Sequence, residues 1–317
     1  MKRIVVVGSG GQDGRILTER LTSEGHCVVG VDLAGVTGGE ALGLGLAPTL
    51  DMTDVARVRD FMAAVTPDEL YYFAAYHHSS EEQDDDIPGL LRRSYDVHVA
   101  GLVSCLDAAR SAAPRCRTFY AASSHIFGVP PTPVQDESTP FAPRDMYGLT
   151  KTAGIHACRF YRERYGLHVS AGILYNHESR YRPRKFVSQR IAQGALEARA
   201  AKREGRTTKL VLGDLTAVVD WGYAPDYVDA AIRMVTAEIP DDFVVATGIP
   251  HTVEDFVAAA FGRVGLDWRE HVEQNSALVR RQGTTLVGNS SKLRKATAWK
   301  PSVGFEEMIG ILVQDAG

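Results

Sequence analysis

The sequence predicts an α/β protein in which a doubly wound parallel sheet carries a smaller, interleaved α/β domain. Short apolar runs alternate with amphipathic helical stretches as far as about residue 175, an alternation typical of a parallel sheet covered by helices. A glycine-rich turn joins the first apolar run to the first helical stretch. Beyond residue 176 the alternation loosens and basic residues cluster, which predicts the smaller domain.

The elements are placed in chain order from their apolar periodicity. Residues 4–7 form an unbroken apolar run and predict a buried strand, and residues 12–23 carry Ile16, Leu17 and Leu21 at helical spacing. The same patterns predict further strands at 27–31, 71–75, 118–122, 168–174, 210–212 and 244–247. They predict further helices at 90–110, 147–165, 226–235 and 253–264, with a polar helix ending near residue 203.

These patterns also predict the division into domains. Residues 1–175, joined by about 216–245, are expected to form the larger domain around the sheet. Residues 176–215 and 246–317 are expected to form the smaller domain. A length of 317 residues agrees with two domains, at roughly 150 residues each.

Composition excludes several classes of protein. The chain is 44% hydrophobic and 23% charged, as in ordinary globular proteins, so global disorder is excluded. A net charge of −4 and a pI near 6.2 give no general attraction to nucleic acid or to an anionic membrane. No apolar run reaches the roughly 20 residues needed to span a bilayer. Four scattered cysteines without C-x-x-C spacing predict free thiols in a reducing cytoplasm.

The glycine-rich turn predicts a dinucleotide site. A G-x-x-G-x-x-G motif at Gly8, Gly11 and Gly14, with Gln12 and Asp13 inside it, follows the first strand and opens the first helix. Glycines allow the tight turn, the close approach of backbone to a pyrophosphate and the packing of helix on strand. The N–H groups of the helix N-terminus then face the phosphates. This context predicts a Rossmann-type domain.

An acidic residue at the end of the second strand favours NAD over NADP. Asp32 can accept both ribose hydroxyls of NAD and would repel a 2′-phosphate. The next residues, Leu33, Ala34 and Gly35, include no arginine. Further on, Asp51 and Met52 are expected to contact the adenine, the alternative being a helix cap near residue 54.

A tyrosine, a lysine and a serine form the candidate catalytic group. Tyr147 and Lys151 lie four residues apart and therefore share one face of the predicted helix. An ammonium near a phenol is expected to lower the phenol pKa, so that Tyr147 exchanges a hydroxyl proton while hydride moves to or from a nicotinamide. Ser123 ends a strand at the carboxyl edge of the sheet, where ligands bind in such folds.

Motifs along nearly the whole chain resemble one enzyme family. They read G-S-G-G-Q-D-G (8–14), F-A-A-Y-H-H (73–78), P-R-D-M-Y-G-L-T-K (143–151), L-Y-N-H-E-S (174–179), F-V (186–187), D-W-G-Y-A (220–224), G-N-S-S-K (288–292) and A-W-K-P (298–301). The chain resembles the extended short-chain dehydrogenases/reductases, the nucleotide-sugar epimerases and dehydratases, and within them the GDP-mannose 4,6-dehydratases.

The resemblance implies a role for each matched residue. Ser123, Tyr147 and Lys151 would be catalytic, and Ala74 and Ala75 would line the cofactor site. The implied substrate-binding residues are His78, Ser124, Asn176, Lys185, Arg190, Arg280 and Arg281. The implied enzyme oxidises the sugar C4 hydroxyl of a GDP-mannose-like substrate to a 4-keto intermediate and then eliminates water. The long helices at 90–110 and 147–165 resemble those of a family dimer interface, so a homodimer is expected, with a tetramer as the alternative.

Two departures from the family pattern keep other outcomes open. His125 stands where the dehydratases carry the glutamate that takes the C5 proton, although an imidazole can also act as a base near neutral pH. Val219 stands where an arginine precedes D-W-G, and Arg182, Arg184 or Arg280 would have to replace it. Epimerisation at C4, C3 or C5, 4-keto reduction, and a non-catalytic dinucleotide sensor are the alternatives. No histidine spacing predicts a metal site.

Overall fold

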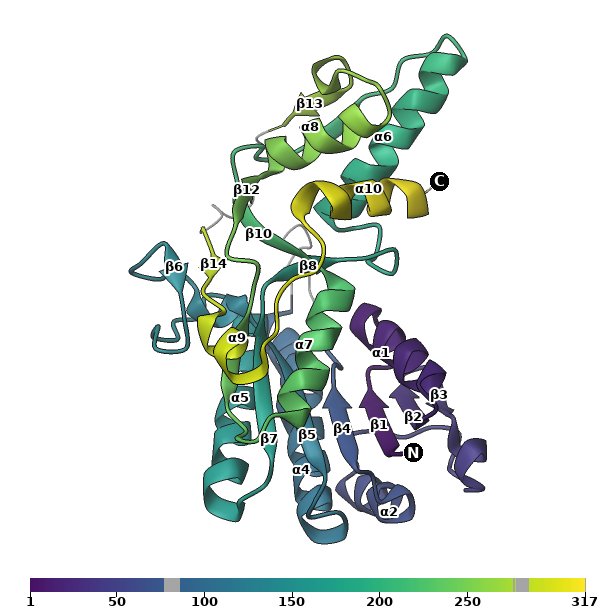
Figure 1. Ribbon diagram of the computed structural model, residues 1–317, viewed down its shortest axis with the longest axis vertical. Helices are drawn as coiled ribbons and strands as arrows, with labels where there is room; N and C mark the ends of the chain where they lie inside the picture. The colour runs from purple at the N-terminus through teal and green to yellow at the C-terminus, as the bar shows by residue number, and fades with distance from the viewer. Residues whose placement is uncertain (77–85, 276, 278–284, 317) are drawn as a thin grey trace.

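A seven-stranded sheet forms the base of the molecule (Figure 1). The computed structural model describes residues 1–76, 86–275, 277 and 285–316. In spatial order the strands are β11 (Asp242–Val245), β7 (Val169–Leu174), β5 (Arg117–Ser123), β4 (Glu69–Tyr72), β1 (Arg3–Val7), β2 (Cys27–Asp32) and β3 (Gly35–Thr37). Every neighbouring pair is parallel except β2–β3. The predicted fold class is confirmed.

Helices cover both faces of this sheet. On one face α1 (Gln12–Ser23) packs against α7 (Ala224–Thr236), while α2 (Val55–Val65), α4 (Gly101–Ala112) and α5 (Met146–Tyr165) cover the other (Figure 1). The central strands are therefore buried on both sides, and all six residues of β7 are buried. Within the described ranges, no helix is both long and apolar enough to cross a bilayer.

The smaller domain lies beyond the carboxyl ends of the parallel strands (Figure 1). Its three-stranded sheet consists of β12 (Pro250–Thr252), β10 (Val218–Tyr223) and β8 (Asn176–Glu178). Two further strand pairs are β9 (Leu210–Leu212) with β13 (Val272–Gln274), and β6 (Val134–Gln135) with β14 (Val287–Gly288). The remaining long helices are α6 (Val187–Arg203), α8 (Val253–Arg263) and α10 (Phe305–Asp315), and α9 (Ser291–Thr297) lies beside β11.

Two separate apolar clusters correspond to these two parts. The first surrounds the seven-stranded sheet and includes Leu293 and Trp299 from late in the chain. The second joins α6, α8 and α10 through side chains such as Ile191, Phe256 and Leu312. We propose the expected division at about residue 176, with about 216–245 returning to the larger domain; residues between 227 and 246 belong to the first cluster and support this proposal.

Several elements differ from the expectations. The expected helix at 90–110 is α3 (Ile87–Tyr95), a π-helical turn η2 (Asp96–Ala100) and α4 in succession. The antiparallel edge strand β3 was not expected. The strand expected at 71–75 ends at Tyr72, because the N–H groups of Phe73 and Ala74 both donate to the carbonyl of Val7 and turn the chain toward β1. The short helices η1 (Gly39–Leu42), η3 (Ser124–Phe127) and η4 (Trp268–Glu270) occupy connections.

The larger core contains one buried amine. Lys151 on α5 is 1% exposed, and its Nζ donates to the carbonyl of Ala121 at 2.7 Å and lies 5.0 Å from the centre of the Tyr120 ring. Burial lowers the pKa of Lys151 to about 7, although the charge of Asp13 acts in the opposite direction. The unfolded chain binds this proton below its ordinary pKa near 10.4, whereas the folded chain binds it only below about 7.

Lys151 should therefore make the free energy of unfolding rise with pH between about 7 and 10, by up to about 1.4 kcal/mol per pH unit. The variant Lys151→Met should lose this slope and be about 1–4 kcal/mol more stable at pH 7, because it buries no ionisable group. Urea unfolding of both proteins across this pH range measures the difference. Parallel pH profiles for the two proteins would contradict the assignment.

Candidate active site

A cavity of about 1100 Å³ opens at the carboxyl edge of the seven-stranded sheet. It collects most of the residues singled out in the sequence. Those that line it are Gly8, Gly11, Gln12, Asp13, Gly14, Asp32, Asp51, Met52, Ala74, Ala75, Ser123, His125, Tyr147, Lys151, Asn176 and Lys185. The ends of β1, β2, β4, β5 and β7 meet here because parallel strands share one carboxyl edge.

The glycine loop forms one wall and requires two of its glycines. Gly8 has φ +88°, and a Cβ there would come within 2.6 Å of the backbone nitrogen of Ala74. A Cβ on Gly14 would collide with the carbonyl of Gly8. Gly11 has more room and is the N-cap of α1, where no side chain caps the helix. The first N–H groups of α1 are thus directed at the cavity, as in a pyrophosphate site.

The two acidic positions beyond the loop have different environments. Asp32 Oδ2 accepts from the N–H of Gly10 at 2.8 Å, and its Oδ1 accepts from the N–H of Leu33 at 2.7 Å. The carboxylate of Asp32 is therefore fixed at the mouth of the glycine loop. Asp51 accepts from the N–H and the hydroxyl of Thr53, which lowers the pKa of Asp51. The cap of α2 is Asp54, which accepts from the N–H of Arg57.

The candidate catalytic group lies on β5 and α5. Ser123 is the last residue of β5, and its Oγ accepts from the N–H of His125 at 3.3 Å. Tyr147 lies in the first turn of α5, and its ring meets the His125 ring edge-on with 5.5 Å between their centres. Lys151 follows one turn later, with Nζ 5.7 Å from the centre of the Tyr147 ring. These side chains surround one point of the cavity wall.

The pKa of Tyr147 differs from the expectation. Burial raises it to about 12, while the charge of Arg182 and a hydrogen bond with Ser123 act to lower it. The amine of Lys151 is directed at the carbonyl of Ala121, and burial disfavours its ionised form.

Sequence reasoning missed an ion pair that joins the glycine loop to β8. His177 Nε2 lies 3.0 Å from Asp13 Oδ2. Burial alone would lower the pKa of His177, but the charge of Asp13 raises it; likewise burial alone would raise the pKa of Asp13, but His177 lowers it. Gln12 adds a bond from Nε2 to the carbonyl of His177. The L-Y-N-H-E-S motif contained this histidine, but only Asn176 was singled out in it.

A second group missed by sequence reasoning lies in the segment between β8 and α6. Arg182, Pro183 and Phe186 line the cavity beside Lys185. The guanidinium carbon of Arg182 lies 3.7 Å from the centre of the Phe186 ring, and its Nε lies 3.4 Å from Glu178 Oε2. Arg182 was considered in the sequence only as a replacement for a missing arginine. Val219 itself packs at the edge of the smaller apolar cluster.

Some expected site residues lie elsewhere. Ser124 is 3% exposed within η3 and does not line the cavity. Arg190 also lies outside the lining, and its Nη2 donates to the carbonyl of Val211 at 2.7 Å. Ser124 and Arg190 were expected to bind substrate. In the structure Ser124 is buried within η3, and Arg190 bonds to the chain at Val211. His78, Arg280 and Arg281 lie outside the described residues.

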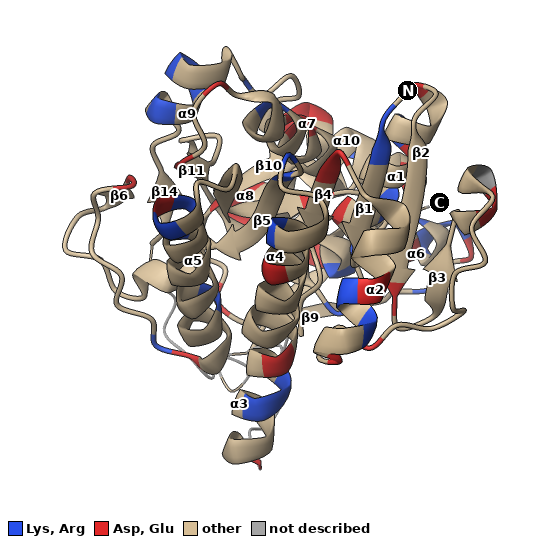
Figure 2. Cartoon of the chain, turned by 90° about the horizontal axis from the view of Figure 1, so that it is seen from below, with Lys and Arg blue, Asp and Glu red and all other residues tan. Residues whose placement is uncertain are grey.

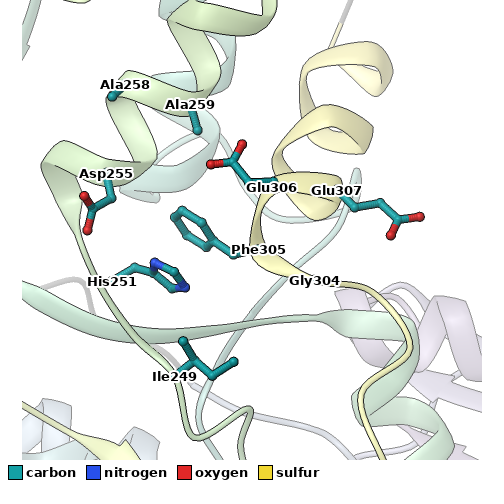
Figure 3. Close-up of a pocket in the computed structure, with 9 residues that line it drawn as sticks. All are labelled: Ile249, His251, Asp255, Ala258, Ala259, Gly304, Phe305, Glu306 and Glu307. Carbon is teal, nitrogen blue, oxygen red and sulfur yellow. The ribbon is translucent and has the colours of Figure 1, made fainter.

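A second hollow, of about 790 Å³, lies on the smaller domain (Figure 3). The rings of His251 and Phe305 stack on its floor with centres 3.6 Å apart. Figure 3 shows the carboxylates of Asp255 and Glu306 beside these rings, while that of Glu307 points away from them. The three carboxylates of this hollow disfavour an anionic diphosphate, and none of the described residues singled out in the sequence lines it. The first cavity is therefore the candidate active site.

The side chains of the described ranges also bear on metal chemistry. Among them, no group of three or more histidine, cysteine, aspartate or glutamate side chains is arranged to hold a metal ion.

Solved structures with the same fold come from several enzymes. A dTDP-glucose 4,6-dehydratase from Bacillus anthracis, in complex with NAD, aligns with a TM-score of 0.81 at 18% identity, over 99% of this chain and 96% of that one. RMD from Pseudomonas aeruginosa, complexed with NADPH, aligns with a TM-score of 0.80 at 18% identity, over 100% and 99%. At these identities the likeness shows the fold.

Sequence comparison shows the family. The family model described as GDP-mannose 4,6 dehydratase matches residues 5–312. GDP-mannose 4,6 dehydratase 2 of Arabidopsis thaliana is 36% identical over 336 aligned positions, which cover 99% of this chain and 86% of that protein. The resemblance predicted from the motifs is confirmed, and the chain is a dehydratase-like enzyme. It belongs to the GDP-mannose 4,6-dehydratase family of the extended short-chain dehydrogenases/reductases.

Proposed function

We propose that this enzyme is an NAD-dependent nucleotide-sugar 4,6-dehydratase acting on GDP-mannose or a closely similar substrate. The observation that carries the proposal is the convergence of Ser123, Tyr147 and Lys151 in one cavity with the glycine loop. The family match favours dehydration over the epimerase, reductase and sensor alternatives.

In this proposal each residue of the group has one task. Ser123 hydrogen-bonds the C4 hydroxyl and orients it, and Tyr147 takes the hydroxyl proton. A protonated Lys151 makes the phenolate of Tyr147 less costly in this buried place. The bound nicotinamide dinucleotide supplies a hydride acceptor for C4 and a hydride donor for C6. Once C4 is a ketone, the C5–H bond is acidified, and His125 is the base that faces the cavity.

The geometry of the glycine loop supports NAD as the dinucleotide. Gly8 and Gly14 allow the backbone to approach a pyrophosphate, so the residues present fit such a group. The fixed carboxylate of Asp32 would accept ribose hydroxyls and repel a 2′-phosphate.

Cationic and polar side chains from the segment that follows β7 fit an anionic substrate. Asn176, Arg182 and Lys185 line the same cavity, and Arg182 would supply the diphosphate contact that Val219 cannot make. The four cysteines are buried and form no disulfide with one another, which supports a reducing compartment such as the cytoplasm.

Exposed apolar side chains on two helices support a homodimer. Leu149 and Phe160 on α5 are 45% and 53% exposed, and Leu91 and Tyr95 on α3 are 37% and 48% exposed. Figure 2 shows α4 and α5 side by side, with α3 continuing beyond them. A dimer that pairs this face with its copy would remove these side chains from water.

The variant Tyr147→Phe should lower kcat for GDP-mannose with NAD about 10²–10⁴-fold, because no phenol remains to take the C4 hydroxyl proton. Its KM should change only a few-fold. The assay follows formation of a 4-keto product that absorbs in alkali. If the wild-type protein forms no product from GDP-mannose or any other nucleotide sugar, the proposed function is wrong.

Asp32→Ala should weaken NAD binding about tenfold and reduce the preference for NAD over NADP, because one good hydrogen-bonded contact contributes roughly 1.4 kcal/mol. Calorimetric titration with each dinucleotide measures both affinities. A wild-type protein that binds NADP more tightly than NAD would overturn the assignment of Asp32.

Phe160→Glu should convert the dimer to a monomer, because it places a charge at the centre of the apolar face. Light scattering after size exclusion measures the mass. The matched control is Ile239→Glu, which changes a 72% exposed residue outside these helices and should leave the mass unchanged. A monomeric wild-type protein would contradict the dimer.

A further inference from the structure

A histidine–aspartate contact stands beside the catalytic tyrosine. His125 Nδ1 lies 3.0 Å from Asp145 Oδ2. An ionised carboxylate can only accept, so this contact assigns the imidazole hydrogen to Nδ1. The remaining ring nitrogen, Nε2, then carries a lone pair that can accept a proton, and His125 lines the cavity.

Asp145 is held from two sides. Its other oxygen, Oδ1, accepts from the N–H of Gly148 at 2.7 Å and thereby caps α5. Gly148 also lets η3 approach this helix, because a Cβ there would come within 2.6 Å of the carbonyl of His125. The side chain of Asp145 is 21% exposed, against 43% for that of His125. The carboxylate is thus fixed behind the imidazole, and the imidazole is the more accessible of the two.

We propose that Asp145 is a positioning residue that makes His125 the proton carrier of the elimination step. The proposal rests on the proposed function and adds a partner to its base. The carboxylate fixes which ring nitrogen is free and stabilises the imidazolium that forms, as in other histidine–aspartate pairs of enzymes. A glutamate in the place of His125 would be a carboxylate base by itself and would need no such partner.

The elimination step balances with this pair alone. Nε2 of His125 takes the proton from C5 of the 4-keto sugar. The electron pair of the C5–H bond becomes the C5–C6 double bond as the C6–O bond breaks. The departing hydroxyl takes the proton from Nε2 and leaves as water, which returns the imidazole to its neutral form. Asp145 remains ionised throughout and exchanges no proton.

Asp145→Asn tests the proposal, because an asparagine still caps α5 but cannot stabilise the imidazolium. In the purified enzyme with NAD and GDP-mannose, kcat should fall about 10–100-fold while KM changes less than about twofold. With substrate deuterated at C5, the isotope effect on kcat should rise in the variant, because proton removal from C5 becomes slower. The matched control Asp54→Asn makes the same change at the cap of α2 and should leave kcat unchanged.

The same Asp145→Asn substitution made in a His125→Glu variant distinguishes two roles of Asp145, positioning His125 and capping α5. In His125→Glu the base is itself a carboxylate, so adding Asp145→Asn should cost little further activity. An equal loss of kcat in both backgrounds, or an unchanged isotope effect, would show that Asp145 only caps the helix and would overturn the proposal. Failure of the proposed function looks different, since the wild-type protein would then yield no 4-keto product at all.

Discussion

The close packing of the glycine loop against the end of β4 is the constraint on which the site depends. Gly8 lies against the backbone of Ala74, and Gly14 lies against Gly8, with no room for a side chain at either position. This contact brings the start of α1 to the carboxyl edge of the sheet. Asp13 then reaches His177 on β8, and this ion pair joins the glycine loop to the three-stranded sheet. The same part of the cavity wall therefore contains both the N-terminus of α1 and the Asp13–His177 ion pair.

The candidate catalytic side chains Tyr147 and Lys151 are ionisable, and the fold buries both of them. Lys151 and Tyr147 are both withdrawn from water, and burial shifts the pKa of the amine down and that of the phenol up. The two shifts work against an ionised pair in this structure. The charges of a bound dinucleotide and substrate would alter the pKa values of Lys151 and Tyr147. The charge of Arg182 already acts to lower the pKa of Tyr147. The fold thus holds its proton carriers in a place where small changes of nearby charge have large effects.

Much of the larger domain could be predicted from the sequence, since its signals are local. The strand before Gly8, the helix after Gly14, and the spacing of Tyr147 and Lys151 are each contained in one short segment. The missed features depend on contacts between distant segments. His177 becomes a site residue only because β8 returns to the glycine loop, and the π turn within 96–100 leaves no periodic signature. The burial that raises the pKa of Tyr147 and the bond from the Lys151 amine to the carbonyl of Ala121 likewise leave no signal in the sequence spacing.

We propose that the enzyme oxidises a nucleotide sugar at C4 and then removes water from it. The most direct measurement mixes the wild-type enzyme and NAD with GDP-mannose in a single turnover and follows the near-ultraviolet absorbance of the bound nicotinamide ring. We expect a transient rise in absorbance that decays as the 4-keto-6-deoxy sugar appears. Substrate that binds and leaves unchanged, with no rise in absorbance, would contradict it.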